Sequence, residues 1–171
     1  MNLSIIIPCF NSSAFLKEAL DSLCSQRLDE VEFICVNDGS FDNTFDILNE
    51  YQRKDPRFKI IDKPNTGYGD SVNKGLDQAQ GKYVAIFEPD DFIDSNMYED
   101  LFHLAEENQL DVAKCCYYRY TEGLGDTFTS ISKIPKNQVL CPSLNQNIFL
   151  EHPQIWNAIY LRNWLNSYGI R

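Results

Sequence analysis

The chain has 171 residues, 43% of them hydrophobic and 13% aromatic, and it is therefore long enough and apolar enough to bury the core of one ordinary domain. Its formal net charge of −10 argues against binding to nucleic acid or to an anionic membrane surface, because phosphates would be repelled across most of the protein. An acidic chain can still bind phosphate groups through a metal ion.

Apolar runs typical of buried strands alternate with segments of amphipathic helical spacing. Strands are expected over residues 3–8, 31–40, 58–62, 82–87 and 110–120. Residues 66–80 are expected to be a glycine-rich loop that runs into a short helix, and further helices are expected over residues 12–26, 42–54 and 95–109. In the last of these helices Leu104 is expected to face the core. Residues 121–145 show no period and are expected to be irregular, with at most an edge strand, whereas residues 145–169 return to helical spacing.

This alternation predicts an α/β fold of three layers, α/β/α, in which helices flank a mostly parallel, Rossmann-like sheet. No shift in composition marks a domain boundary, so residues 1–171 are expected to form a single domain. The six cysteines include no CxxC pair, and the first apolar run is stopped by Pro8, too early for a signal peptide or a membrane span. These features predict a cytoplasmic protein.

Polar and acidic residues follow three of the predicted strands, with PCFN after the first, VNDGSFD after the second and FEPDD after the fourth. Ligands bind outside the carboxyl ends of parallel strands, so the topology would bring these segments together. The carboxylates after the fourth strand would repel one another unless a divalent cation neutralised them. Hard oxygen ligands suit Mg²⁺ or Mn²⁺, which complete their shell with substrate phosphate and water. A solvated turn that caps the next helix is the alternative.

Four motifs in this order, SIIIPCFN, VNDGSFDNT, NTGYGDSVNKGL and GKYVAIFEPDDFID, resemble the nucleotide-sugar-binding half of family 2 glycosyltransferases of the GT-A fold. The segment HPQIWNAIYLRNWL is similar to one that is common in the bacterial members. The resemblance implies transfer of a sugar from a nucleotide-diphosphate donor, usually UDP-linked, to an acceptor hydroxyl, generally with inversion. It further implies a use in bacterial polysaccharide or glycoconjugate synthesis, with a carbohydrate or lipid-linked acceptor.

The resemblance assigns the base of the donor to the ends of the first two strands. Pro8, Cys9, Phe10 and Asn11 match the loop that borders the base. Phe10 stands where tyrosine is usual, so ring packing against uracil is kept without a phenol hydrogen bond. Asp38 matches the acid that accepts the uracil N3–H, although in NDGS it could also be a turn residue.

The resemblance assigns the diphosphate to the motif SVNKG. Asn73 matches the family pattern, whereas Val72 stands where many members have an arginine. Lys74 or Lys63 is expected to compensate in part for the missing diphosphate contact.

The resemblance assigns the metal to a DxD-like motif. Glu88 takes the first place of this motif and could hold ribose or a metal-bound water. Asp90 is implied as the ligand of Mg²⁺ or Mn²⁺, and Asp91 as its close support. The cation would act as a Lewis acid on the departing diphosphate.

An inverting transfer also needs a general base that deprotonates the acceptor hydroxyl. Family members carry this base after the segment that resembles residues 156–171, so the base is expected beyond residue 171 and the chain is expected to be truncated before the acceptor part. Peripheral association with the inner face of the membrane through later residues is a further expectation. Two other functions stay open: a non-catalytic nucleotide-sugar-binding module and a sugar-phosphate nucleotidyltransferase.

Overall fold

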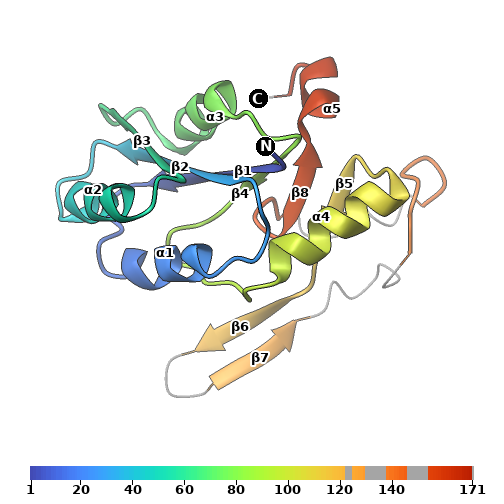
Figure 1. Ribbon diagram of the computed structural model, residues 1–171, viewed down its shortest axis with the longest axis horizontal. Helices are drawn as coiled ribbons and strands as arrows, with labels where there is room; N and C mark the ends of the chain where they lie inside the picture. The colour runs from blue at the N-terminus through green and yellow to red at the C-terminus, as the bar shows by residue number, and fades with distance from the viewer. Residues whose placement is uncertain (122–124, 130–137, 146–153, 171) are drawn as a thin grey trace.

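The computed structural model describes residues 1–121, 125–129, 138–145 and 154–170 (Figure 1). The main sheet consists of β1 (Leu3–Cys9), β2 (Val31–Asp38), β3 (Phe58–Lys63), β4 (Tyr83–Ile86), β5 (Val112–Lys114) and β8 (Ala158–Leu161). Their order across the sheet is β3-β2-β1-β4-β8-β5. The first four strands run parallel, and β8 runs antiparallel to both of its neighbours, β4 and β5.

Helices cover both faces of this sheet (Figure 1). They are α1 (Leu16–Cys24), α2 (Thr44–Lys54), α3 (Tyr68–Gln78), α4 (Met97–Asn108) and α5 (Arg162–Ser167). The apolar residues of α1, α2 and α4 join one core cluster with Ile5 and Phe33 of the sheet. On the other face, Leu76 of α3 and Leu165 of α5 pack in a second cluster with Val36 of β2. The predicted three-layer α/β/α fold with a mostly parallel sheet is therefore confirmed.

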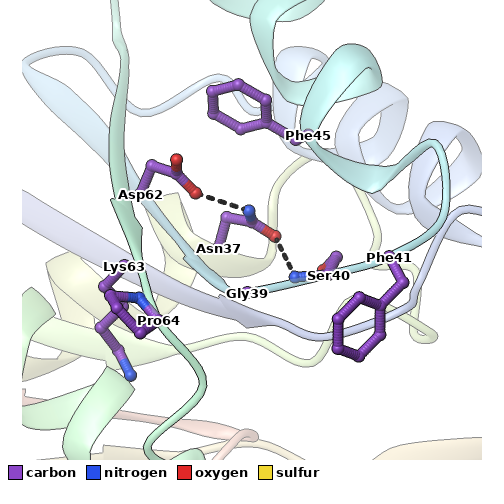
Figure 2. Close-up of a pocket in the computed structure, with 8 residues that line it drawn as sticks. All are labelled: Asn37, Gly39, Ser40, Phe41, Phe45, Asp62, Lys63 and Pro64. Atoms are coloured by element: carbon purple, nitrogen blue, oxygen red, sulfur yellow. Dashed lines mark hydrogen bonds between the residues drawn. The ribbon is translucent and has the colours of Figure 1, made fainter.

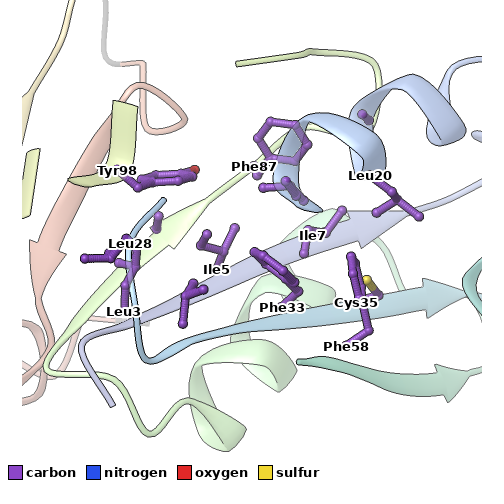
Figure 3. Close-up of a cluster of buried hydrophobic side chains, with 14 of the residues drawn as sticks. Leu3, Ile5, Ile7, Leu20, Leu28, Phe33, Cys35, Phe58, Phe87 and Tyr98 are labelled. Carbon is purple, nitrogen blue, oxygen red and sulfur yellow. The ribbon is translucent and has the colours of Figure 1, made fainter. Parts of the chain in front are cut away.

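An almost continuous core anchors the strands. Every residue of β1 and β2 is buried, as expected for parallel strands that are covered on both faces. Figure 3 shows Ile5, Ile7 and Phe33 of these strands together with Leu20 of α1 and Tyr98 of α4. Burial of one such side chain contributes about 1.5–3 kcal/mol. The positions of the strand ends are therefore well determined.

Helix α3 lies close to β1 because residue 75 has no side chain. A Cβ atom on Gly75 would lie 2.4 Å from Cγ2 of Ile6, which is far inside van der Waals contact. The glycine of the SVNKG motif is thus required by packing. The same close approach fixes the position of Asn73, two residues earlier on the helix.

A buried polar network stabilises the amino-terminal ends of β1 and β2. The Glu32 side chain is 1% exposed and accepts hydrogen bonds from Ser4 Oγ at 2.5 Å, Lys59 Nζ at 2.6 Å and the Gln80 N–H at 2.8 Å. Burial alone would raise the pKa of Glu32, but these hydrogen bonds outweigh it and hold the pKa below its usual value.

We expect the stability of the fold to decrease in acid, and Glu32→Gln to remove part of that dependence. Because the folded-state pKa of Glu32 is lowered, its ionised form stabilises the fold above the unfolded pKa of about 4.3, and this stabilisation is lost as pH falls through the folded value. Glu32→Gln should lower the free energy of unfolding by about 2 kcal/mol at neutral pH and by less in acid. Urea unfolding measures both differences. Equal losses at neutral and acidic pH would contradict the argument.

Two expectations about the second half of the chain are wrong. Residues 158–161 were expected to be helical but form β8, because a short apolar run fits both periods and the pairing with β4 and β5 decides between them. Residues 110–120 do not form one strand. β5 joins the main sheet, whereas β6 (Tyr117–Thr121) pairs with β7 (Gly125–Thr129) in a second sheet of two strands. The strand β7 lies in the stretch for which an edge strand was left open.

One residue of α4 also differs from expectation, since Leu104 is 42% exposed instead of facing the core. Helix α5 confirms the helical spacing for residues 162–167, and Arg162 Nε donates to Gly81 O at 2.6 Å, which ties α5 to the sheet. Residues 146–153 of the same predicted helix lie outside the described residues. Across the described ranges, no helix is long and apolar enough to cross a membrane.

Candidate functional site

The carboxyl ends of β1, β2 and β4 meet at one edge of the sheet, as the sequence predicts. The register pairs Cys9 of β1 with Asn37 of β2, and Ile6 of β1 with Ile86 of β4. The three segments that follow these strands therefore start next to one another. We call this edge, with the loops that leave it, the carboxyl edge.

Asn11 fixes the loop after β1 to the loop after β2. Its N–H donates to Ser40 Oγ at 3.0 Å, and its side-chain Oδ1 accepts from the Phe41 N–H at 2.8 Å. Asn11 has a φ of 50°, in the left-handed region that asparagine tolerates better than most residues. The residue expected to border a base is thus also the link between two loops of the carboxyl edge.

Two exposed aromatic rings stand at the carboxyl edge. Phe10 is 45% exposed and Phe41 is 87% exposed, and the two rings meet edge to face with centroids 6.2 Å apart. Pro8 and Cys9, which were also expected to border the base, are buried within β1. The rings of Phe10 and Phe41 are therefore the apolar surfaces of these loops that a planar ligand could contact.

Asp38 anchors the loop after β3. It is 4% exposed, and its oxygens accept hydrogen bonds from the N–H groups of Thr66 at 2.8 Å and Gly67 at 2.9 Å, and from Nζ of Lys63. Burial alone would raise the pKa of Asp38, but the hydrogen bonds outweigh it and lower the pKa below its usual value. The sequence did not predict this contact between the end of β2 and residues 63–67.

Lys63 is engaged by two carboxylates. Its ammonium pairs with Asp38 and, at 3.0 Å, with Oδ2 of Asp70, and its side chain is 10% exposed. A lysine held in this way cannot neutralise a diphosphate without leaving a carboxylate unpaired. Of the two lysines expected to compensate for Val72, the exposed Lys74 is therefore the better placed.

Asn73 carries a buried oxygen that has no hydrogen-bond partner in the described part of the chain. This atom is Oδ1 of Asn73, on helix α3 two residues before Gly75. Buried polar atoms are nearly always paired in native proteins. The oxygen is thus suited to accept a hydrogen bond from a ligand or a water.

The acidic stretch after β4, residues 88–94, is linked to α3 by Tyr68. The Tyr68 hydroxyl donates to Oε1 of Glu88 at 2.5 Å. Burial, followed by the charges of Asp90 and Asp91, raises the pKa of Glu88 although the Tyr68 hydrogen bond opposes the shift. Desolvation and the charge of Asp90 raise the pKa of Asp91. Both shifts mean that ionised carboxylates are destabilised here, and a nearby cation would relieve this.

The acidic stretch fits a cation that arrives with a ligand. Among the described residues, no three His, Cys, Asp or Glu side chains come together in a way that could hold a metal ion. Mg²⁺ bound through one or two carboxylates takes its remaining oxygens from phosphate and water. Asp90 is exposed and next to Asp91, so the residues fit a metal whose shell a diphosphate completes, and they do not fit a metal held by protein alone.

An open cavity of about 490 Å³ lies between the ends of β2 and β3 and the start of α2 (Figure 2). In its wall, Asn37 Nδ2 donates to Oδ1 of Asp62 at 2.7 Å. Successive residues of a strand point to opposite faces, so Asn37 and Asp38 face different sides of the sheet. The Asp38 side chain therefore does not line the cavity, although its partner Lys63 does. No pattern in the sequence indicates this cavity. It is lined by Asn37, Gly39, Ser40, Phe41, Phe45, Asp62, Lys63 and Pro64.

Sequence reasoning missed Tyr68 and Phe41. Both lie in polar or glycine-rich segments next to strand ends, in TGYGD and DGSFD, and Tyr68 is 45% exposed. A large aromatic residue in such a loop is not needed for the core, so its position beside a strand end is a signal that could have found both residues.

The three-layer fold and its carboxyl edge define a GT-A glycosyltransferase domain. The structure is similar to crystal structures of residues 1–349 of TarS from S. aureus, one of which is in complex with UDP-GlcNAc, with a TM-score of 0.81, 28% identity, and coverage of 99% of this chain and 48% of the other. The mannosyltransferase PcManGT of Pyrobaculum calidifontis shares the fold, with a TM-score of 0.71, 17% identity, and coverage of 98% of this chain and 46% of the other.

The sequence comparison gives the family. The profile of glycosyl transferase family 2 matches residues 4–168. The uncharacterized glycosyltransferase EpsJ of Bacillus subtilis (strain 168) is 32% identical over 166 residues, which are 93% of this chain and 47% of EpsJ. The chain belongs to glycosyl transferase family 2. It spans about half the length of the curated relatives EpsJ and EpsH of Bacillus subtilis (strain 168).

Proposed function

We propose that the chain is the donor-binding part of an enzyme that transfers a sugar from a UDP-linked donor to a hydroxyl of a carbohydrate or lipid-linked acceptor, with inversion and with Mg²⁺ or Mn²⁺. The observation that carries the proposal is the meeting, at the carboxyl edge, of exposed rings after β1 and β2 with the acidic stretch after β4. A nucleotide diphosphate needs an apolar surface for its base and a cation for its phosphates. The complex of TarS with UDP-GlcNAc supports the proposal.

In this proposal the base packs against Phe10 and Phe41, and Asp38 accepts the uracil N3–H. A carboxylate has about four lone-pair sites, and three donors already occupy Asp38, so it retains capacity for one more. Asn73, with its unpartnered Oδ1, accepts a hydrogen bond from a hydroxyl of the donor. Pro8 and Cys9 contribute through the backbone, because their side chains are buried.

Asp90 binds the cation together with the diphosphate, and Asp91 supports Asp90. When bound, the cation supplies Lewis-acid stabilisation of the departing diphosphate. The exposed Lys74 adds positive charge on the α3 side of the site.

We further propose that the general base and the acceptor site lie beyond residue 171, and the coverage of about half the length of EpsJ supports this. We further propose a cytoplasmic enzyme with peripheral association with the inner face of the membrane. The six free cysteines support a reducing compartment.

Calorimetric titration of UDP into the chain, with and without Mn²⁺, tests the proposal, with GDP as the matched comparison. We expect binding of UDP that depends on Mn²⁺ and is stronger than binding of GDP. Absence of UDP binding in the presence of Mn²⁺ would contradict the donor site.

Two further measurements distinguish the other functions, one on this chain and one on a longer protein. A nucleotidyltransferase would bind UTP and a sugar 1-phosphate and release pyrophosphate. A non-catalytic module would bind UDP, but a longer protein containing it would neither transfer nor hydrolyse the sugar of a UDP-linked donor.

A further inference from the structure

We propose that Tyr68 is a positioning residue, which holds Glu88 so that one oxygen of this carboxylate is presented to the nucleotide donor. The inference rests on the proposed function, because it requires a donor at the carboxyl edge. It adds a residue that neither the motifs nor the family comparison assigns.

The geometry of the pair carries the inference. Tyr68 is the first residue of α3 and Glu88 follows β4, so the hydrogen bond between them joins two segments that meet at the carboxyl edge. The bond uses Oε1 of Glu88 and leaves Oε2 to accept from a ligand. The negative charges of Asp90 and Asp91 repel a third carboxylate, and the Tyr68 hydroxyl is the donor that holds Glu88 beside them.

Tyr68 is itself held in place by the Asp38 anchor. Asp38 accepts from the N–H groups of Thr66 and Gly67, which immediately precede Tyr68 in the chain. Oγ1 of Thr66 in turn donates to Oδ2 of Asp70 in the first turn of α3. The end of β2 is therefore connected, through this loop and Tyr68, to the acidic stretch after β4.

The pair also gives a reason for glutamate at residue 88. An aspartate there would have one methylene less and its carboxylate would withdraw from the Tyr68 hydroxyl, which already lies at hydrogen-bond distance from Glu88. Tyr68 and Glu88 thus act as a unit, and their effects on donor binding should not be independent.

A double-mutant cycle measured by calorimetry with UDP and Mn²⁺ tests the inference. The proteins are the wild type, Tyr68→Phe, Glu88→Gln and the double variant. We expect Tyr68→Phe to weaken UDP binding roughly fivefold and Glu88→Gln roughly tenfold, as for the loss of one hydrogen bond. The double variant should bind no more weakly than Glu88→Gln alone. Tyr168→Phe is the matched control, because Tyr168 directly follows α5 and is 71% exposed. This variant should bind UDP like the wild type.

The outcomes separate the inference from the proposed function. If the wild type does not bind UDP, the proposed function fails. If the wild type binds but Tyr68→Phe binds equally well, or if the two effects multiply in the double variant, the positioning role of Tyr68 is wrong. Should Tyr68→Phe lower the melting temperature, Glu88→Asp replaces it, and it should bind UDP as weakly as Tyr68→Phe while melting like the wild type.

Discussion

Asp90→Asn should abolish most of the gain in UDP affinity that Mn²⁺ gives. The substitution keeps the shape of the side chain but removes the charge that the exposed carboxylate offers to the cation. Metal stabilisation of a leaving group supplies several kcal/mol, and a loss of about 3 kcal/mol corresponds to roughly a 150-fold lower rate. In a longer protein with the acceptor part, sugar transfer should therefore decrease by about two orders of magnitude.

Asp94→Asn is the matched control for Asp90→Asn. Asp94 belongs to the same acidic stretch and is exposed, so the variant makes the same change in net charge four residues away. Asp94→Asn should bind UDP with Mn²⁺ nearly as the wild type does. If the two variants lose affinity equally, the general negative charge of the stretch is responsible, and Asp90 is not the metal ligand.

Asp38→Asn should be among the most destabilising single substitutions at the carboxyl edge. The amide of asparagine cannot accept all three hydrogen bonds of the buried carboxylate, because its NH₂ group would face one of the donors. Lys63 would also lose its buried, negatively charged partner. We expect a loss of about 3 kcal/mol in the free energy of unfolding. For a chain of this size this corresponds to a melting temperature lower by roughly 6–12 °C.

Asp62→Asn is the control for this prediction. Asp62 lies on the neighbouring strand β3 but is exposed, and an asparagine there can still accept the hydrogen bond from Asn37. Its melting temperature should stay within about 2 °C of the wild type. Thermal unfolding of both variants measures the difference. An Asp38→Asn protein that melts like Asp62→Asn would contradict the anchoring role of Asp38.

The first half of the fold could be predicted well from the sequence, because the spacing of its hydrophobic residues agrees with the strands and helices that form in the structure. The runs that became β1 and β2 are mostly apolar and show no alternation with polar residues, and this is the pattern of strands covered on both faces. Residues 158–161 could not be assigned in the same way, since a four-residue apolar run has no decisive period. Its strand conformation depends on pairing with β4 and β5, which lie far away in the chain.

The candidate site, like the fold, was predictable only in part from the sequence. The edge that carries Phe10, Asp38 and Asp90 follows from topology, because the carboxyl ends of parallel strands share one edge. The partners of these residues do not follow from it. Neither the Asp38 contacts with Thr66 and Gly67 nor the Tyr68–Glu88 hydrogen bond leaves a spacing signal, since each joins loops that come together only in the folded chain.

Paramagnetic broadening by Mn²⁺ in the amide spectrum of the isotope-labelled chain tests the central claim, a nucleotide and metal site at the carboxyl edge, most directly. In the presence of UDP, the account predicts that substoichiometric Mn²⁺ broadens the amide signals of Glu88, Asp90 and Asp91 first, and that Asp90→Asn removes the effect. Broadening centred on another part of the chain, or broadening that is the same with and without UDP, would contradict a cation site that a diphosphate completes.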